Sequence, residues 1–159
     1  MDDKAFEEQI LALEPKLYRT AYALLWNDAD VADAMQECIL KAWRKLDSLK
    51  DDERFSAWTM RILINECRTL QRRNKHRLIS FDEAIGDNEP MSEEPVDLGL
   101  RQALHELHPK LRLPLLLHHM DGYALTDIAE MLHLPVSTLK GRLYEARKQL
   151  RTLLGREEF

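Results

Sequence analysis

The stretch LTDIAEMLHLPVSTLKGRLYEARKQL, residues 125–150, decides the fold of the carboxyl-terminal part of the chain. Its apolar residues recur at helical spacing on either side of the tripeptide HLP, which predicts a short helix over about 125–132 and a long one over about 136–154. Ala129 is small enough to lie where two such helices cross, and His133 occupies the turn position that needs a left-handed backbone. The pattern therefore predicts a helix-turn-helix.

The long second helix of this motif divides into an apolar stripe and a polar, basic face. The predicted buried stripe consists of Leu139, Leu143, Ala146, Leu150 and Leu153. The outer face and its flanks hold Ser137, Thr138, Lys140, Gly141, Arg142, Tyr144, Arg147, Lys148 and Arg151. Residues 137–156 contain six bases and one acid, a net charge of +5 that is typical of a DNA recognition helix. We expect the first turn to contact base edges and the later basic residues to contact phosphates; the alternative is a solvated basic helix.

Upstream of this motif the sequence predicts two further helices, which complete a four-helix unit. The first begins after Asp97, which is a suitable N-cap residue. The second begins at Pro109, is kinked at Pro114 and ends at the dipeptide Asp121-Gly122. The expected second domain is residues 98–159.

The amino-terminal part predicts three amphipathic helices that pack into another small all-α unit, residues 1–79. The first helix has its apolar stripe at Phe6, Ile10, Leu13, Leu17 and Leu24. The second has it at Val31, Met35, Cys38, Ala42 and Leu46. The third, from about residue 55 to 73, has it at Phe55, Trp58, Ile62 and Leu70.

Charge is distributed unevenly along the 159 residues. With 28 acidic and 23 basic residues the net charge is -5, which taken alone argues against nucleic-acid binding. Residues 80–99, however, hold seven acids and no base, whereas residues 51–79 hold seven bases and four acids. The acidic stretch has two prolines, two glycines and no apolar periodicity. We therefore expect residues 80–97 to be a flexible acidic linker between two helical domains.

A second set of basic residues lies at the end of the first domain. Arg61, Asn65, Arg68 and Arg72 recur at spacings of four, three and four, which places them on one helical face. Aromatic residues near the start of the same helix can support unstacked bases, which makes single-stranded nucleic acid one candidate ligand. A solvated basic face is the alternative.

Several other classes of function are excluded or disfavoured. No apolar run reaches the roughly 18 residues of a membrane span, and the start MDDKAFEEQI lacks the order of a signal peptide, so we expect a cytoplasmic protein without membrane insertion. Cys38 and Cys67 are expected to be reduced core residues. Neither the histidines nor the acidic residues form a metal-ligand pattern, no nucleophile-base pair is evident, and we expect neither an enzyme nor a cofactor.

Three segments occur in an order that resembles the extracytoplasmic-function (ECF) sigma factors of bacterial RNA polymerase. They are DADVADAMQECILKAWRKL at 28–46, FSAWTMRILINECRTLQRR at 55–73 and LPVSTLKGRLYEARKQL at 134–150. The resemblance covers nearly the whole chain. It implies that residues 1–79 are sigma region 2, which binds the polymerase core and opens the promoter -10 element, and that residues 98–159 are sigma region 4, which recognises the -35 element.

The resemblance also assigns roles to residues. Asp33, Gln36 and Glu37 match the positions that bind the clamp helices of the largest polymerase subunit. Positions implied at the -10 element are Lys50, Arg54, Trp58, Arg61, Asn65, Arg68 and Arg72. Those implied at the -35 element are Ser137, Thr138, Lys140, Arg142, Tyr144, Arg147 and Lys148. The family further implies control by an anti-sigma factor, often bound to a membrane.

One rival interpretation keeps the helix-turn-helix and changes the rest. A stand-alone transcriptional regulator would use its amino-terminal helices for sensing or dimerisation and would bind a palindromic operator as a dimer. A helical adaptor that binds only protein is a second rival. A sigma factor differs from both because it binds core polymerase and directs initiation.

Overall fold

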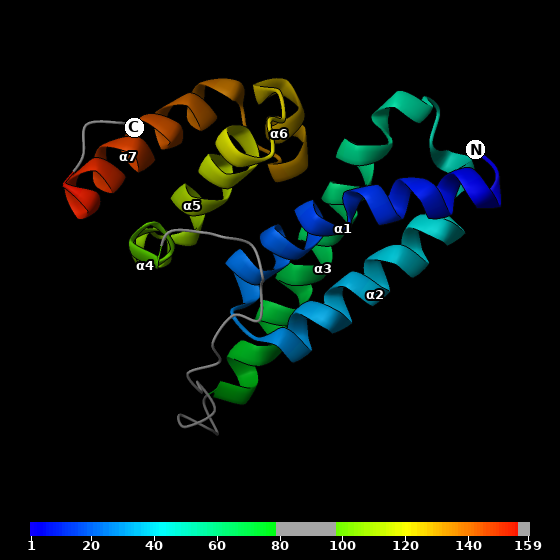
Figure 1. Ribbon diagram of the computed structural model, residues 1–159, viewed down its shortest axis with the longest axis horizontal. Helices are drawn as coiled ribbons and strands as arrows, with labels where there is room; N and C mark the ends of the chain where they lie inside the picture. The colour runs from blue at the N-terminus through cyan, green and yellow to red at the C-terminus, as the bar shows by residue number, and fades with distance from the viewer. Residues whose placement is uncertain (79–97, 156–159) are drawn as a thin grey trace. The chain divides into compact units, whose positions relative to one another are not determined.

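The computed structural model describes residues 1–78 and 98–155, and all the regular structure within these residues is helical. The chain forms two compact units, Met1–Met91 and Ser92–Phe159 (Figure 1). The expected all-α fold with two helical units is confirmed. The predicted linker 80–97, with the proposed N-cap Asp97, lies outside the described residues.

The first unit is built from three α-helices that all contact one another. They are α1 (Asp3–Leu25), α2 (Asp28–Arg44) and α3 (Phe55–Leu78), with short 3-10 turns η1 (Leu46–Ser48) and η2 (Asp52–Arg54) before α3 (Figure 1). Side-chain caps set two of the helix starts. Asp2 accepts a hydrogen bond of 2.8 Å from the Ala5 amide, and Asn27 accepts one of 3.0 Å from the Asp30 amide.

The core of the first unit confirms the stripe predicted for α1 and corrects the other two. In α2 the buried residues are Val31, Ala34, Cys38 and Ala42, whereas Met35 is half-buried and Leu46 falls in η1. In α3 they are Phe55, Thr59, Met60, Leu63, Ile64 and Cys67, whereas Trp58, Ile62 and Leu70 are half-buried. The predictions held for Val31, Cys38, Ala42 and Phe55 and were wrong for the half-buried residues, because a small residue such as Ala34 at a helix contact allows closer approach than a larger apolar one.

The second unit contains the four predicted helices: α4 (Leu98–Glu106), α5 (Pro109–Leu115), α6 (Leu125–Leu132) and α7 (Val136–Leu154) (Figure 1). Pro109 stands at the start of α5, where its missing N–H costs no hydrogen bond. After Pro114 the helix widens into one π-helical turn, η4 (Leu116–Met120), closed by the Asp121 amide donating to the Leu116 carbonyl oxygen at 3.1 Å. The predicted stop at Asp121-Gly122 is confirmed.

The helix-turn-helix forms as predicted. His133 ends α6 in the left-handed conformation, with φ 56° and ψ 47°. The Leu134 amide then donates to the carbonyl oxygen of Ala129 at 2.9 Å, which closes the turn. The buried stripe of α7 is Leu139, Leu143, Ala146 and Leu150. Leu153 is 43% exposed, so its predicted burial was wrong; it lies in the last turn of α7, one residue before the helix ends at Leu154.

Candidate nucleic-acid and protein interfaces

The outer face of α7 presents the predicted polar and basic side chains to solvent. Exposed residues on it are Ser137, Thr138, Lys140, Gly141, Tyr144 and Lys148. Tyr144 is 65% exposed, so its ring and hydroxyl are available for contact. The basic residues Arg142 and Arg147 are half-buried at the flanks. The positive end of the helix dipole lies in the first turn, beside Ser137 and Thr138, and adds to the attraction for phosphate.

Arg147 is held by a residue that the sequence did not indicate. Its Nε–H donates to Nε2 of His119, in η4, at 3.0 Å. Burial, the Arg147 charge and His118 together lower the pKa of His119, so the ring is neutral at pH 7 and able to accept this bond. The two residues are 28 positions apart in sequence, and only the packing of η4 beside α7 brings them together.

In the first unit, the candidate -10 residues lie in the segment before α3 and along α3 itself. Lys50 and Arg54 are exposed, and η2 is capped by Asp51, whose carboxylate accepts from the Glu53 amide at 3.0 Å. The half-buried Trp58 ring lies 6.1 Å from the buried ring of Phe55, tilted by 39°. Phe55 therefore supports Trp58 from below and leaves part of the indole accessible.

The basic face of α3 continues from Trp58 towards the helix end. Arg61 and Arg68 are half-buried, and Asn65 and Arg72 are exposed. Local hydrogen bonds order this face: the Thr69 hydroxyl donates to the Asn65 carbonyl oxygen at 3.0 Å, and Arg72 donates to the same hydroxyl oxygen at 3.3 Å. The structure thus places the predicted nucleic-acid residues of α3 along one side of a regular helix.

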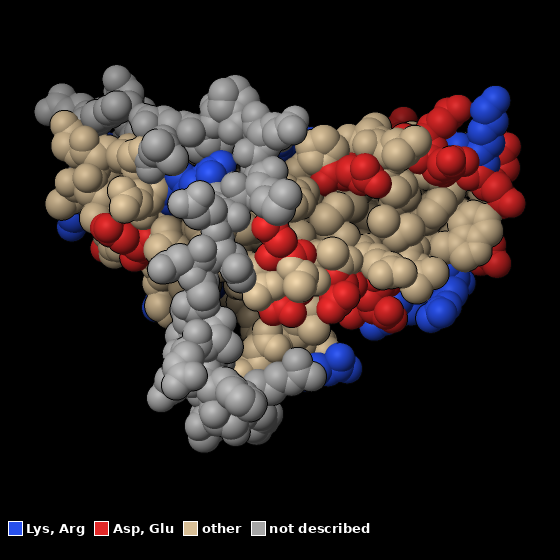
Figure 2. Space-filling model, turned by 60° about the horizontal axis from the view of Figure 1, so that its bottom comes forward, with Lys and Arg blue, Asp and Glu red and all other residues tan. Residues whose placement is uncertain are grey.

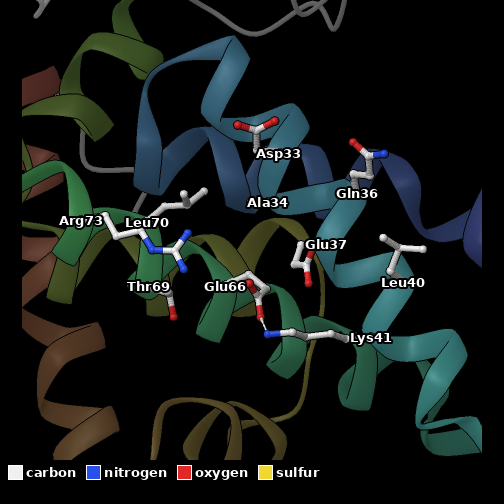
Figure 3. A pocket seen from close by; sticks show the side chains of 10 residues that line it. All are labelled: Asp33, Ala34, Gln36, Glu37, Leu40, Lys41, Glu66, Thr69, Leu70 and Arg73. Atoms are coloured by element: carbon white, nitrogen blue, oxygen red, sulfur yellow. Dashed lines mark hydrogen bonds and ion pairs between the residues drawn. The ribbon is translucent and has the colours of Figure 1, made fainter.

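The three candidate core-binding residues line a groove of about 550 Å³ between α2 and α3 (Figure 3). Asp33, Gln36 and Glu37 come from α2, and Asp33 and Gln36 are exposed. The opposite wall is formed by residues of α3 at spacings of three, one and three: Glu66, Thr69, Leu70 and Arg73. Figure 3 shows the Arg73 guanidinium extending from α3 into the space between the helices. This α3 wall was not predicted as part of the interface.

An ion pair joins the two walls of this groove. Lys41 on α2 binds Glu66 on α3 through its Nζ (Figure 3), and the Glu66 side chain is largely buried there. The exposed apolar side chain of Leu40 adjoins the pair. Figure 2, which brings the α2 side of this unit forward, shows acidic side chains spread across that face. The groove is thus suited to a partner that offers basic and apolar side chains.

Among the described residues no group of three histidine, cysteine or acidic side chains is placed to hold a metal ion. Cys38 and Cys67 are buried free thiols whose pKa burial raises to about 12. No helix in the described part of the chain is long and apolar enough to cross a membrane.

Comparison with known proteins decides the family. The model of sigma-70 region 2 matches residues 10–77, and that of sigma-70 region 4 matches residues 98–150. The RNA polymerase sigma factor SigV of Bacillus subtilis is 30% identical over 142 residues, 89% of this chain and 86% of that protein. The ECF sigma factor SigW of the same organism is 28% identical and is matched over 96% of this chain and 90% of its own length. This chain belongs to the ECF sigma factors.

Solved structures agree with this assignment. The sigma factor RpoE of Bartonella quintana, solved with the anti-sigma factor NepR, superposes with a TM-score of 0.85 at 26% identity, over 98% of this sigma factor and 99% of that chain. CnrH, solved with the cytosolic domain of CnrY, shares the fold at a TM-score of 0.69 and 24% identity. This ECF sigma factor therefore confers promoter specificity on RNA polymerase, and the stand-alone regulator is not favoured.

Proposed function

We propose that this sigma factor joins core RNA polymerase through residues 1–79, acting as region 2, and that residues 98–159, acting as region 4, read the -35 element. Residues 80–97 link the two. The factor itself performs no chemistry, because nucleotide addition belongs to the polymerase, and it acts where the polymerase acts, in the cytoplasm. The match of the two family models to the two parts of the chain, in this order, supports the division.

Core binding is assigned to the acidic lip of the groove between α2 and α3, which is formed by Asp33 and Glu37 of α2. Asp33, Gln36 and Glu37 contact the clamp helices of the largest subunit, and the α3 wall with Arg73 extends that contact. The support is the gathering of all three predicted residues at one hollowed surface. A charged rim around an apolar residue such as Leu40 also fits the composition of specific protein interfaces.

Recognition of the -10 element is assigned to the segment before α3 and to the basic face of α3. Lys50 and Arg54 contact the displaced strand, and Trp58, resting on Phe55, stacks on an unpaired base. Aromatic stacking contributes about 1–3 kcal/mol per base, enough to offset a substantial part of the cost of opening a base pair. The sugar-phosphate backbone of the same DNA strand is contacted by Arg61, Asn65, Arg68 and Arg72.

The main support for the proposal is that α7 has one face buried in the second unit and the opposite face exposed to solvent. Leu139, Leu143, Ala146 and Leu150 are buried in the second unit, which fixes the rotation of the helix, and the opposite face exposes Ser137, Thr138, Lys140, Gly141, Tyr144 and Lys148. Ser137, Thr138, Lys140 and Tyr144 read base edges in the major groove, while Arg142, Arg147 and Lys148 bind phosphates.

An anti-sigma factor is the expected regulator. The sigma factor RpoE has been solved with the anti-sigma factor NepR, and CnrH, which shares the fold, has been solved with the cytosolic domain of CnrY. We expect this partner, whether soluble or anchored in a membrane, to cover the same groove between α2 and α3 and so to compete with the polymerase core.

Reconstitution tests the function directly. Core polymerase with this factor should initiate from a defined promoter, and core alone should not. Lys148→Ala, at an exposed position assigned to phosphate, should weaken promoter binding by the holoenzyme and reduce the slope of log K against log salt by about 0.9, the value for one phosphate contact. Lys110→Ala removes an exposed charge from α5 instead and should leave both unchanged. Failure to bind core or to direct initiation contradicts the proposal.

A further inference from the structure

A short chain of contacts runs from the turn before α6 to the candidate DNA-binding face of α7. The backbone carbonyl oxygen of Tyr123 is 3.0 Å from Nδ1 of His118. The His118 ring lies edge-on to that of His119, with ring centroids 5.4 Å apart and an interplanar angle of 73°. His119 in turn accepts from Arg147 at 3.0 Å. The histidine pair thus connects the turn before α6 with one basic side chain of α7.

The π-helical turn places this pair. A π-turn accommodates an extra residue and rotates the side chains that follow it relative to a regular α-helix. Here it spans Leu116–Met120 and therefore includes both histidines. Leu116 and Leu117 in the same turn are buried, which fixes its orientation in the core. Such turns are frequent at functional sites, and this one leads directly into the helix-turn-helix.

The bond to His119 uses one guanidinium donor, the Nε–H, and leaves the two Nη groups for other acceptors. Arginine has five N–H donors, one on Nε and four on Nη1 and Nη2. With the Nε–H of Arg147 directed at His119, the four others remain for phosphate oxygens. A free arginine side chain loses rotamer freedom when DNA immobilises it, whereas one already held in place loses less.

We propose that His119 is a positioning residue for DNA binding: through Nε2 it holds the Arg147 guanidinium in the orientation in which the Nη groups grip a promoter phosphate. The inference rests on the proposed role of α7 at the -35 element. His119 itself touches Arg147 and not the DNA, so its effect passes through Arg147 alone.

The test measures holoenzyme affinity for a promoter as a function of salt, with full-length variants. His119→Ala should weaken binding about threefold to tenfold, the loss expected when one side chain must be ordered on binding. The salt slope should stay unchanged, since the Arg147 charge remains. Arg147→Ala should weaken binding and also reduce the slope by about 0.9. His119→Gln, whose amide oxygen can accept from the same Nε–H, should restore affinity to within about twofold of the wild type.

The double variant supplies the decisive comparison. If His119 acts only through Arg147, then His119→Ala adds nothing in the Arg147→Ala background. If Arg147→Ala weakens binding and His119→Ala does not, the positioning role is wrong and the DNA contact stands. If neither variant changes promoter affinity, the assignment of Arg147 to phosphate fails, and the positioning role fails with it. If both substitutions add independently, His119 contacts DNA itself, and the positioning role is again wrong.

A spectroscopic measurement on the free protein separates positioning from folding. The Arg147 Nε–H resonance, assigned by its loss in Arg147→Ala, should be protected from solvent exchange in the wild type and in His119→Gln. It should exchange rapidly in His119→Ala. Gln149→Ala is the matched control, because the Gln149 side chain also donates a hydrogen bond of 3.0 Å on α7, in this case to the Glu145 carboxylate. That variant should change neither the Arg147 resonance nor promoter affinity, and equal exchange in His119→Ala and wild type would overturn the proposal.

Discussion

Gln71 on α3 donates a hydrogen bond of 2.9 Å to the backbone carbonyl oxygen of Leu24, in the last turn of α1. Three residues later Asn74 donates to the Asp30 carboxylate on α2 at 2.8 Å. Helix α1 ends at Trp26 in the left-handed conformation, without a glycine, so a side chain from another helix satisfies one of its last carbonyls. These two bonds hold the second half of α3 against the junction of α1 and α2, and this half carries Arg73, which lines the groove.

Loss of the Gln71 hydrogen bond should lower the stability of the first unit. Gln71→Ala removes one half-buried hydrogen bond, and we expect the free energy of unfolding to fall by about 1 kcal/mol. The three tryptophans, Trp26, Trp43 and Trp58, all lie in the first unit, so their fluorescence in a urea titration reports on that unit alone. Gln9→Ala is the matched control, because Gln9 is exposed on α1, and it should change stability by less than about 0.5 kcal/mol. Equal midpoints for the two variants would show that the Gln71 bond contributes nothing.

Reversal of one charge in the groove should weaken core binding. Glu37→Lys places a positive charge on the acidic lip opposite Arg73, and we expect at least a tenfold loss of affinity for core polymerase, equivalent to about 1.4 kcal/mol. Fluorescence anisotropy of labelled factor titrated with core measures this. Glu8→Lys makes the same charge change at an exposed position of α1 outside the groove. If Glu8→Lys weakens binding as much, the effect is one of net charge and the groove is not the docking surface.

The positions of most helices could be predicted from the sequence, because the start and end of a helix depend mainly on residues nearby in the chain. Periodicity and the HLP turn predicted α6 and α7 closely, and the left-handed backbone of His133 was expected. The buried faces of α2 and α3 were less predictable. Ala34 is buried and Met35 only half-buried, although methionine is the more apolar choice, since a small residue allows two helices to approach closely.

Candidate sites within a single helix were also predictable from sequence, whereas sites formed between helices were not. The outer face of α7 could be predicted by subtracting an apolar stripe within one helix. The α3 wall of the groove could not, because Glu66 and Arg73 meet α2 only through tertiary packing. His119 was also missed, since no sequence pattern indicates a π-turn or says which side chain it places beside Arg147.

Stability should depend on the protonation of His119. Burial, then Arg147 on α7 and His118 on η4, lower its pKa in the folded state, whereas the unfolded chain keeps the ordinary value near 6.5. Below that value the unfolded chain binds the proton more readily, so this residue's contribution to stability is present above pH 6.5 and is lost as the pH falls below it.

Comparison of two proteins isolates this effect from those of the other histidines. We expect the free energy of unfolding of the wild type to fall more steeply between pH 7.5 and 5.5 than that of His119→Gln, which has no proton to bind. Urea titrations followed by circular dichroism at each pH measure the two slopes. Parallel slopes would mean that His119 titrates alike in the folded and unfolded chain.

Thiol chemistry gives a final test of the first unit. Cys38 and Cys67 are both fully buried, and burial raises the pKa of each thiol to about 12, with Glu66 adding to the effect at both and Cys67 adding to it at Cys38. Only the thiolate attacks a disulfide reagent, so at pH 7.5 the folded protein should be nearly inert and should react in proportion to its transiently open population.

Labelling should therefore report the same equilibrium as unfolding. In Gln71→Ala, a loss of about 1 kcal/mol should raise the open population, and with it the labelling rate, about fivefold. Gln9→Cys, with a thiol on the exposed surface of α1, should react at once at that position and verify the reagent. Prompt modification of both native cysteines in the wild type would mean that the contact between α2 and α3 opens freely, and the groove that these helices form would then have no fixed geometry with which to select the polymerase.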